Sequence, residues 1–356
     1  MAIYFFLLFL NVIFCLVGYN NKTFDKFGGF LIALFMCGLC CLRDLYCGTD
    51  TINYHRIFFY NPEMSDQRLE PLFLGVRNSF SNFQLFLSFF AVGTYAIIYY
   101  ICAKEVRYTS LALLIFMITP TKFFPESFNI IRQSLASALI LWGFMEWNNK
   151  KLVNTLVLFT IATLFHYSSF IAIFFMLVPR QKIIGFKWAT ILVGTTCLLG
   201  ITGITSLFVQ TFVVGLGEAD IHPLITTYAR YGLRINHTMQ VSSLVLWLIP
   251  LTVFTIVCYP FSEKAKEHYR YYYSVFLIGT IIGNLFIPPM DSGIRFVFSI
   301  MITQILVVPA ALKYAGNQQK AFIAASILLC TASYIFYIYH LQFFYETSIV
   351  PYKSIL

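Results

Sequence analysis

Long uninterrupted apolar runs are the feature of this chain that most limits what it can fold into. Several runs continue for about twenty residues without alternating polar and apolar side chains, which is the length of helix that crosses a bilayer. The composition agrees, because 59% of the residues are hydrophobic and only 11% are charged, against about 25% charged in soluble domains. A soluble fold of 356 residues cannot bury that much apolar surface. A membrane β-barrel is excluded too, since its strands alternate apolar and polar residues.

We therefore predict an all-α polytopic membrane protein that forms a single domain over residues 1–356. Hydropathy predicts about twelve transmembrane helices, or ten to twelve if the short pair 152–165 and 168–179 is a re-entrant hairpin. The predicted spans lie at about 2–18, 28–42, 84–103, 109–124, 130–147, 152–165, 168–179, 188–214, 241–260, 272–287, 295–312 and 321–340.

The distribution of charge predicts how the chain is oriented. The net charge is +9, from 24 Lys and Arg against 15 Asp and Glu. When the loops are assigned to alternating sides, one side carries the whole net charge, so the positive-inside rule makes that side cytoplasmic and both termini external. The two long loops, 43–83 and 215–240, fall on the external side, where we expect the chemistry. In a membrane protein this charge indicates orientation, and we predict no nucleic-acid partner.

Two predicted spans begin with an arginine at the external side, Arg132 and Arg295. The free N–H groups and the positive dipole end of a helix N-terminus attract anions, and a guanidinium can grip phosphate oxygens in a bidentate way. The pair predicts a diphosphate site. For either arginine alone, the simpler interpretation is an interfacial side chain that reaches to water.

A base is suggested by His166, which lies in the external turn between two short apolar segments. Asp50, in a Gly-Thr-Asp turn, is a second candidate. The simpler interpretations are a hydrogen-bonded turn histidine and a solvated loop in which Arg43 pairs with Asp44 or Asp50.

The remaining motifs indicate no cofactor. Nucleotide-binding and zinc motifs are absent from the sequence, and the acidic pair Glu218 and Asp220 lacks a partner histidine, so we predict no metal. The nine cysteines are odd in number and mostly lie in apolar runs, which favours packing over disulfides.

Taken together, the polar motifs resemble the EpsG family of Wzy-type polysaccharide polymerases across about residues 40–300. The resemblance is carried by Arg43…Gly48-Thr49-Asp50-x-x-x-Tyr54, Glu70-Pro71-Leu72, Asn129-x-x-Arg132-Gln133, Phe165-His166-Tyr167-Ser168 and Gly293-Ile294-Arg295.

The resemblance implies a glycosyltransferase of GT-C-like architecture in the bacterial inner membrane, with its active face outside the cytoplasm. It implies that a growing glycan of O-antigen, capsule or exopolysaccharide is transferred from undecaprenyl diphosphate to a sugar hydroxyl of an incoming lipid-linked repeat unit. Its partners would be these two lipid-linked oligosaccharides, membrane lipid and a protein that regulates chain length.

On this interpretation His166 is the base, with Asp50 as second choice, and no metal or other cofactor takes part. Arg132 and Arg295, with Arg43 as a third candidate, hold the diphosphate. Sugar and loop contacts are assigned to Tyr54, Glu70, Asn129, Gln133, Arg230 and Arg234.

Three alternatives remain open at the level of sequence. They are a flippase or transporter for the same lipid-linked oligosaccharide, a membrane O-acyltransferase and an O-antigen ligase. A flippase is expected to carry broken or charged helices near the middle of the membrane, whereas the ionisable residues here gather at the external ends.

Overall fold

The computed structural model describes residues 1–60, 69–119, 122–180, 184–205, 248–262, 267–286, 293–344 and 348–355. Within these ranges the regular elements are helices, and the one β contact is an isolated bridge between Arg43 and Ser354. The helices are α1 (Ala2–Gly18), α2 (Lys22–Cys41), α3 (Thr51–Phe59), α4 (Pro71–Ser79), α5 (Phe83–Glu105), α6 (Thr109–Ile118), α7 (Phe123–Glu126), α8 (Ile131–Asn148), α9 (Leu152–Phe165), the 3-10 helix η2 (Tyr167–Leu177), α10 (Phe186–Ile201), α15 (Ile249–Cys258), the 3-10 helix η5 (Tyr259–Ser262), α16 (Glu267–Phe286), α17 (Gly293–Met301), α18 (Gln304–Tyr314) and α19 (Asn317–Phe344).

The helices confirm the prediction of an all-helical polytopic membrane protein. Within the described part of the chain, four stretches are long and apolar enough to cross a membrane: Lys22–Cys41, Phe83–Glu105, Val297–Tyr314 and Asn317–Gln342. Shorter apolar helices accompany them at Ala2–Gly18, Thr109–Ile118, Leu152–Phe165, Tyr167–Leu177, Phe186–Ile201 and Ile249–Phe261. The count of twelve spans and the GT-C-like architecture stay predictions.

The structure differs from the hydropathy prediction in several places. The predicted span 109–124 ends as a helix at Ile118, and the short helix α7 begins separately at Phe123. The expected loop 43–83 contains two short helices, α3 and α4, on either side of residues 61–68, which lie outside the described ranges. The predicted span 168–179 is a 3-10 helix, η2. The predicted span 295–312 is divided into α17 and α18. Hydropathy detects apolar length but does not distinguish a continuous helix from a broken or tighter one.

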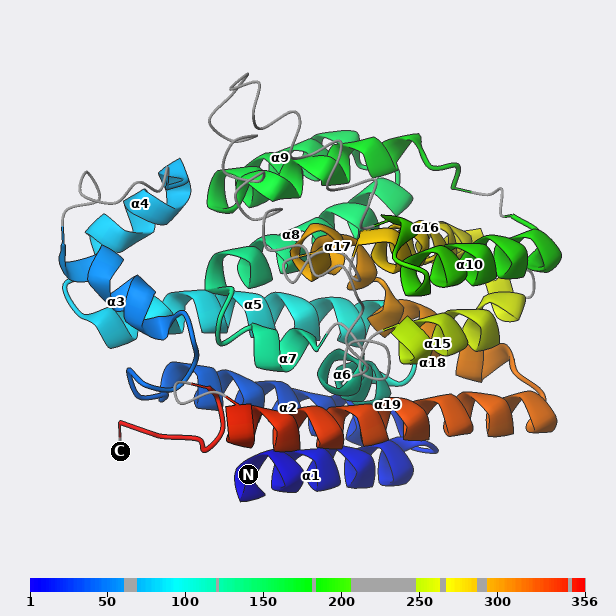
Figure 1. Ribbon diagram of the computed structural model, residues 1–356, viewed down its shortest axis with the longest axis horizontal. Helices are drawn as coiled ribbons and strands as arrows, with labels where there is room; N and C mark the ends of the chain where they lie inside the picture. The colour runs from blue at the N-terminus through cyan, green and yellow to red at the C-terminus, as the bar shows by residue number, and fades with distance from the viewer. Residues whose placement is uncertain are drawn as a thin grey trace.

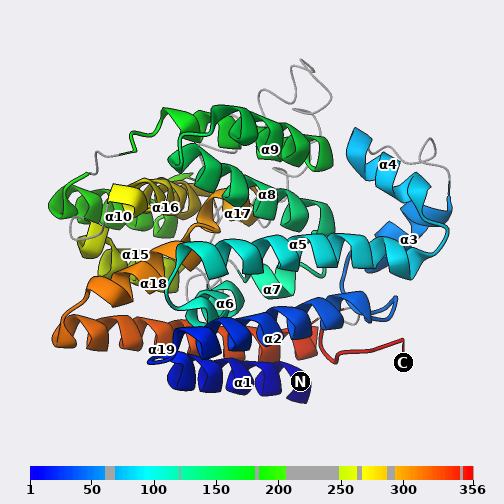
Figure 2. The same ribbon diagram turned by 180° about the vertical axis from the view of Figure 1, so that it is seen from behind.

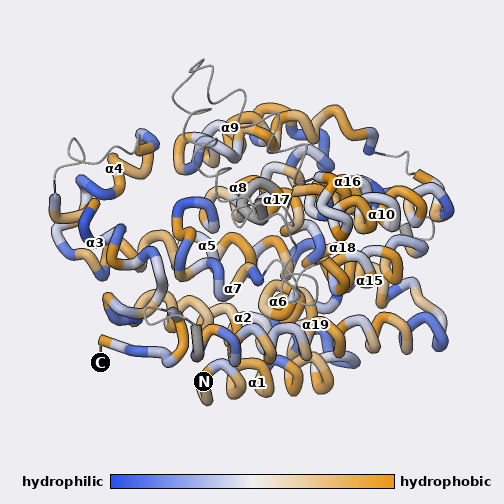
Figure 3. The backbone as a smooth tube through the Cα atoms, in the orientation of Figure 1, coloured by the Kyte–Doolittle hydropathy of each residue, from blue (hydrophilic) through white to orange (hydrophobic). Residues whose placement is uncertain are grey.

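Most helices run back and forth along one direction, so their connections collect at two ends of the bundle (Figures 1 and 2). We call the end that carries α3, α4 and both chain termini the α3–α4 end, which is on the left in Figure 1. Hydrophobic residues dominate the helices, and hydrophilic residues concentrate on α3, on part of α4 and in the turns between helices (Figure 3). This distribution fits helices whose middles lie in lipid.

Helices α8 and α9, which carry Arg132 and precede His166, pack closely against each other. Gly143 of α8 faces the ring of Phe159 on α9 so closely that a Cβ at residue 143 would collide with it. Phe159 in turn packs edge-on against Phe144, with ring centroids 5.6 Å apart. Because α8 begins next to Arg132 and α9 ends next to His166, the spacing of this helix pair sets where those two side chains lie.

Candidate functional site

A buried carboxylate is the centre of the candidate site. Glu70 is the N-cap residue of α4 and is only 3% exposed. One carboxylate oxygen, Oε2, forms an ion pair with Nη1 of Arg132. The other, Oε1, lies 3.1 Å from Nδ1 of His166 and also accepts a 3.4 Å hydrogen bond from the backbone N–H of Tyr167. We call Glu70, Arg132 and His166 the Glu70 cluster.

Arg132 lies at the start of α8 and contacts α4. Arg132 is in the first turn of α8, as predicted, and its guanidinium carbon lies 4.9 Å from the ring centroid of Phe73 on α4. Tyr54 of α3 also interacts with the guanidinium. The Nε atom of Arg132 is buried and has no hydrogen-bond partner within the described residues. The guanidinium is thus held by one carboxylate and an aromatic face while part of it stays unsatisfied.

The histidine is held at one nitrogen, and its other nitrogen has no hydrogen-bond partner among the described residues. His166 is the C-cap residue of α9 and is followed directly by η2, so it lies in the predicted turn. Its side chain is 24% exposed, and no described residue hydrogen-bonds its Nε2 atom. When Nδ1–H donates to a carboxylate, the neutral ring carries its lone pair on Nε2. This arrangement orients the ring through Nδ1 and leaves Nε2 available to accept a proton.

The charge state of the carboxylate follows from its neighbours. Burial raises the pKa of Glu70, but the hydrogen bond from His166 and the positive charge of Arg132 outweigh burial and lower that pKa below its ordinary value of 4.5. Glu70 is therefore ionised at neutral pH. Since both of its oxygens are engaged by the protein, its geometry fits positioning of His166 and Arg132 better than the predicted direct contact with sugar.

The Gly-Thr-Asp turn is tied to the loop in front of α8. Gly48 has a φ of 108°, a conformation that favours glycine, and the backbone N–H of Thr49 donates a 2.8 Å hydrogen bond to Oδ1 of Asn129. Asp50 follows as the N-cap residue of α3. Gln133 is 2% exposed. The predicted roles of Asp50 as a base and of Asn129 and Gln133 as sugar contacts stay predictions.

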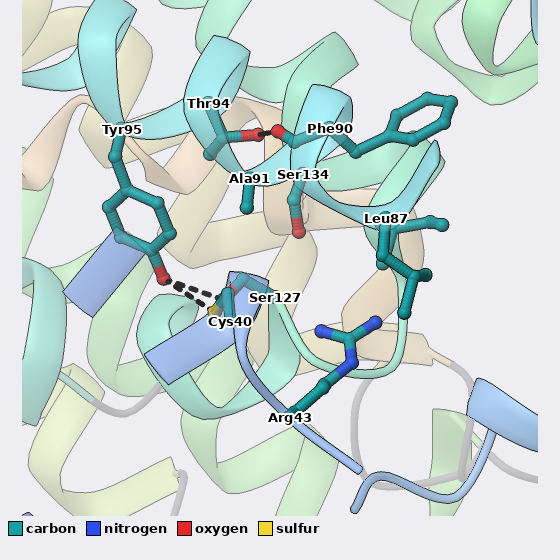
Figure 4. Close-up of a pocket in the computed structure, with 10 residues that line it drawn as sticks. Cys40, Arg43, Leu87, Phe90, Ala91, Thr94, Tyr95, Ser127 and Ser134 are labelled. Carbon is teal, nitrogen blue, oxygen red and sulfur yellow. Dashed lines mark hydrogen bonds between the residues drawn. The ribbon is translucent and has the colours of Figure 1, made fainter. Parts of the chain in front are cut away.

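The other predicted anion-binding residues do not join this cluster in the described structure. Arg295 is in the first turn of α17, as predicted, but its side chain lies outside the described part. Arg230 and Arg234 fall in residues 206–247, which are also outside the described ranges. Arg43 lies in a separate pocket between α2, α5 and α8 (Figure 4). The simpler interpretation, an Arg43 ion pair with Asp44 or Asp50, is wrong, because the described residues give Arg43 no ion pair.

Sequence reasoning named Glu70 as a sugar contact but missed its position between Arg132 and His166. Glu70 and His166 are 96 residues apart, and no spacing rule connects a loop carboxylate with a turn histidine at that separation. The available signal was the Glu-Pro-Leu motif itself, because proline at the first helical position marks the preceding glutamate as an N-cap.

The fold and the cluster first define a class: an all-helical polytopic membrane protein with an arginine, a histidine and a glutamate gathered at one end. Comparison with known families then places the chain, since the model of the EpsG family matches residues 26–354. The chain belongs to the EpsG family, the family of Wzy-type polysaccharide polymerases, which confirms the resemblance. No curated protein and no solved structure matches the chain.

Proposed function

We propose that this protein polymerises surface polysaccharide by transferring a growing glycan from undecaprenyl diphosphate to a sugar hydroxyl of an incoming lipid-linked repeat unit. Family membership suggests a polysaccharide polymerase. The observation that supports the specific mechanism is His166, whose Nδ1 contacts buried Glu70 and whose Nε2 has no hydrogen-bond partner among the described residues.

In the proposed step His166 is the general base. Its Nε2 takes the proton of the acceptor hydroxyl as the hydroxyl oxygen attacks the anomeric carbon of the donor glycan. A new glycosidic C–O bond forms, the bond between that carbon and the diphosphate oxygen breaks, and its electron pair leaves with undecaprenyl diphosphate. Glu70 stabilises the resulting imidazolium, in the way a carboxylate supports a catalytic histidine.

The leaving diphosphate needs positive charge as it departs. Arg132 supplies it from the start of α8, where the helix dipole adds to its effect. We propose Arg295, at the start of α17, as a second cation for the same group. Because guanidinium groups supply this charge, the proposed reaction is metal-independent. We place it at the external face of the bacterial inner membrane, with a chain-length regulator as a protein partner.

The test uses detergent-purified protein and authentic lipid-linked repeat units. We expect a ladder of longer glycans on the lipid carrier, resolved by gel electrophoresis. Detergent removes the two compartments, so a flippase produces no ladder in this assay. Mass spectrometry of the products separates chain extension from acyl decoration, and a requirement for lipid A core as acceptor identifies a ligase.

The decisive control is His166→Gln, which keeps a hydrogen bond to Glu70 available while removing the base. A ladder of unchanged rate from this variant contradicts the proposed mechanism. Absence of any ladder from the wild-type protein contradicts the proposed function itself.

A further inference from the structure

We propose that Arg43 and Ser134 form a second oxyanion site, separate from the Glu70 cluster, that takes a phosphoryl group of a lipid-linked substrate. The proposal rests on the proposed function for the identity of that substrate. The binding of an oxyanion rests on the geometry of the pocket alone.

Arg43 is an unusual arginine because two nitrogens of its buried guanidinium have no hydrogen-bond partner among the described residues. It follows Leu42, the C-cap residue of α2, and is only 2% exposed, and its Nε and Nη2 atoms find no hydrogen-bond acceptor within the described residues. The neighbouring Phe128 ring, 5.4 Å from the guanidinium carbon, offers a weak cation–π contact. Arginine stays charged in proteins, so an anionic or strongly accepting group is missing from this environment.

The pocket presents a second unsatisfied donor beside the guanidinium. Ser134, on the second turn of α8, has a buried hydroxyl without a hydrogen-bond partner, and it points into the same hollow as the Arg43 side chain (Figure 4). The other polar side chains of the lining are already committed. Thr94 donates to the Phe90 carbonyl at 2.7 Å, and Ser127 and Tyr95 hydrogen-bond each other at 2.7 Å. The hollow therefore concentrates a cation and one free hydroxyl.

The backbone around Arg43 is fixed, so the guanidinium is preorganised. The C-terminal segment 348–355 folds back on it: Arg43 forms the bridge with Ser354, and the flanking Asp44 N–H donates to the Lys353 carbonyl at 2.9 Å. From α5, Gln84 donates to the Arg43 carbonyl at 3.2 Å. A cation held this rigidly binds an anion with little loss of conformational freedom.

The size of the hollow limits what it takes. Its free space is about 10 Å³, enough for one water-sized group, so we expect it to receive one oxygen of a phosphoryl group rather than a whole diphosphate.

An aromatic wall separates this pocket from the Glu70 cluster. Phe90 lines the pocket, and its ring lies 5.8 Å from that of Phe73, which contacts Arg132. Polymerisation joins two lipid-linked molecules, and two separate cations on either side of one wall give each a phosphate site.

The test measures binding of inorganic pyrophosphate and of farnesyl diphosphate to the detergent-purified full chain by titration calorimetry. The double variant Arg132→Met, Arg295→Met is used as the background, so that both cations proposed for the leaving diphosphate are removed. In that background we expect saturable pyrophosphate binding that Arg43→Met weakens by about tenfold or more, as loss of a charged hydrogen bond predicts. Ser134→Ala weakens it less, and Arg43→Lys retains part of it.

Arg77→Met is the matched control, because Arg77 lies on α4 with donors already bound to the Ile57 and Tyr60 carbonyls. Pyrophosphate binding that neither Arg43→Met nor Ser134→Ala weakens overturns the proposal. Binding of chloride without binding of pyrophosphate in the same titration overturns it too. If Arg43→Met does not fold, Ser134→Val decides instead, since it fills the hollow without removing a charge. Tighter binding of farnesyl diphosphate than of pyrophosphate assigns the site to a lipid headgroup, and equal binding assigns it to free phosphate, which overturns the lipid assignment.

The two proposals fail separately. Arg43-dependent pyrophosphate binding without glycan extension leaves the oxyanion site intact and removes the polymerase. Glycan extension without Arg43-dependent pyrophosphate binding supports the polymerase and removes the oxyanion site.

Discussion

The two ends of the bundle each contain a buried glutamate that contacts a histidine, and the two pairs differ in one informative way. At the opposite end, Glu105 at the end of α5 contacts Nε2 of His268, while Nδ1 of His268 lies 3.3 Å from Nδ2 of Asn148. Both imidazole nitrogens of His268 are thus occupied by the protein. His166 is occupied at Nδ1 only. The same residue pair therefore uses both imidazole nitrogens at one end, and at the other leaves one nitrogen without a hydrogen-bond partner among the described residues.

The environments of the two glutamates reinforce this difference. Glu105 accepts a 3.2 Å hydrogen bond from the Tyr272 hydroxyl, and its backbone carbonyl accepts one of 2.6 Å from Tyr269. These contacts join α5 to α16. Glu70 instead pairs with the guanidinium of Arg132 through Oε2, while its Oε1 contacts Nδ1 of His166. We infer that the Glu105 pair is structural.

Helix α8 connects the two regions, since Arg132 lies in its first turn and Asn148 is its last residue. At 1.5 Å per residue these positions are roughly 24 Å apart. The two pairs can therefore be altered independently.

The comparison is tested most strongly by removing each histidine. We expect His166→Ala to slow glycan extension by about 10²–10⁴-fold, the usual contribution of a general base. His268→Ala should leave the rate per folded molecule within about threefold of wild type while lowering thermal stability. Single-turnover rates and melting temperatures on the same preparations separate the two effects. Equal losses of rate in both variants would show that Nε2 of His166 has no special role.

Removing the cation comes next in expected size. Arg132→Met should reduce extension by about 10²–10³-fold, as loss of one group that stabilises leaving-group charge does elsewhere. Arg295→Met is expected to lower it in the same direction, and both variants should insert into membranes normally. The measurement is glycan chain length in cells, with membrane fractionation to follow insertion. Full-length glycan from both variants would contradict the proposal that Arg132 and Arg295 bind the leaving diphosphate.

Acid should weaken the Glu70 cluster in a predictable direction. Because the pKa of Glu70 is lowered in the folded protein, its ionised form stabilises the fold above the ordinary value of 4.5, and this contribution is lost as the pH falls through the lowered pKa. The stability difference between wild type and Glu70→Gln should therefore be largest near neutrality and shrink in acid. Thermal unfolding from about pH 3 to pH 7 measures it. A stability difference that grows on acidification would contradict a lowered pKa of Glu70.

The smallest effect is expected from the helix spacing. Gly143→Val places a branched side chain against Phe159, and overpacking of this kind costs about 1–3 kcal/mol. Because α8 and α9 carry Arg132 and His166, we expect a moderate loss of activity along with stability. Gly75→Ala on α4 is the control, since nothing lies within 4 Å of a Cβ there.

Sequence predicted the parts of this protein that depend on local chemistry. Apolar length located most helices, and the first-turn arginine of α8 and the turn histidine between α9 and η2 were both placed correctly. The sequence did not predict which distant side chains meet, because pairing of Glu70 with His166 depends on how α4 packs against α9. Nor could it show that Arg43 is buried, since an arginine at the end of an apolar run usually reaches water.

The C-terminal segment described above has a practical consequence for handling the protein. A label attached at Lys353 or Ser354 would disturb the bridge and the backbone hydrogen bond that hold Arg43 and Asp44. The turn at Ala315 and Gly316, between α18 and α19, lies at the far end of the bundle and is a safer place for a label or a surface tether (Figure 1).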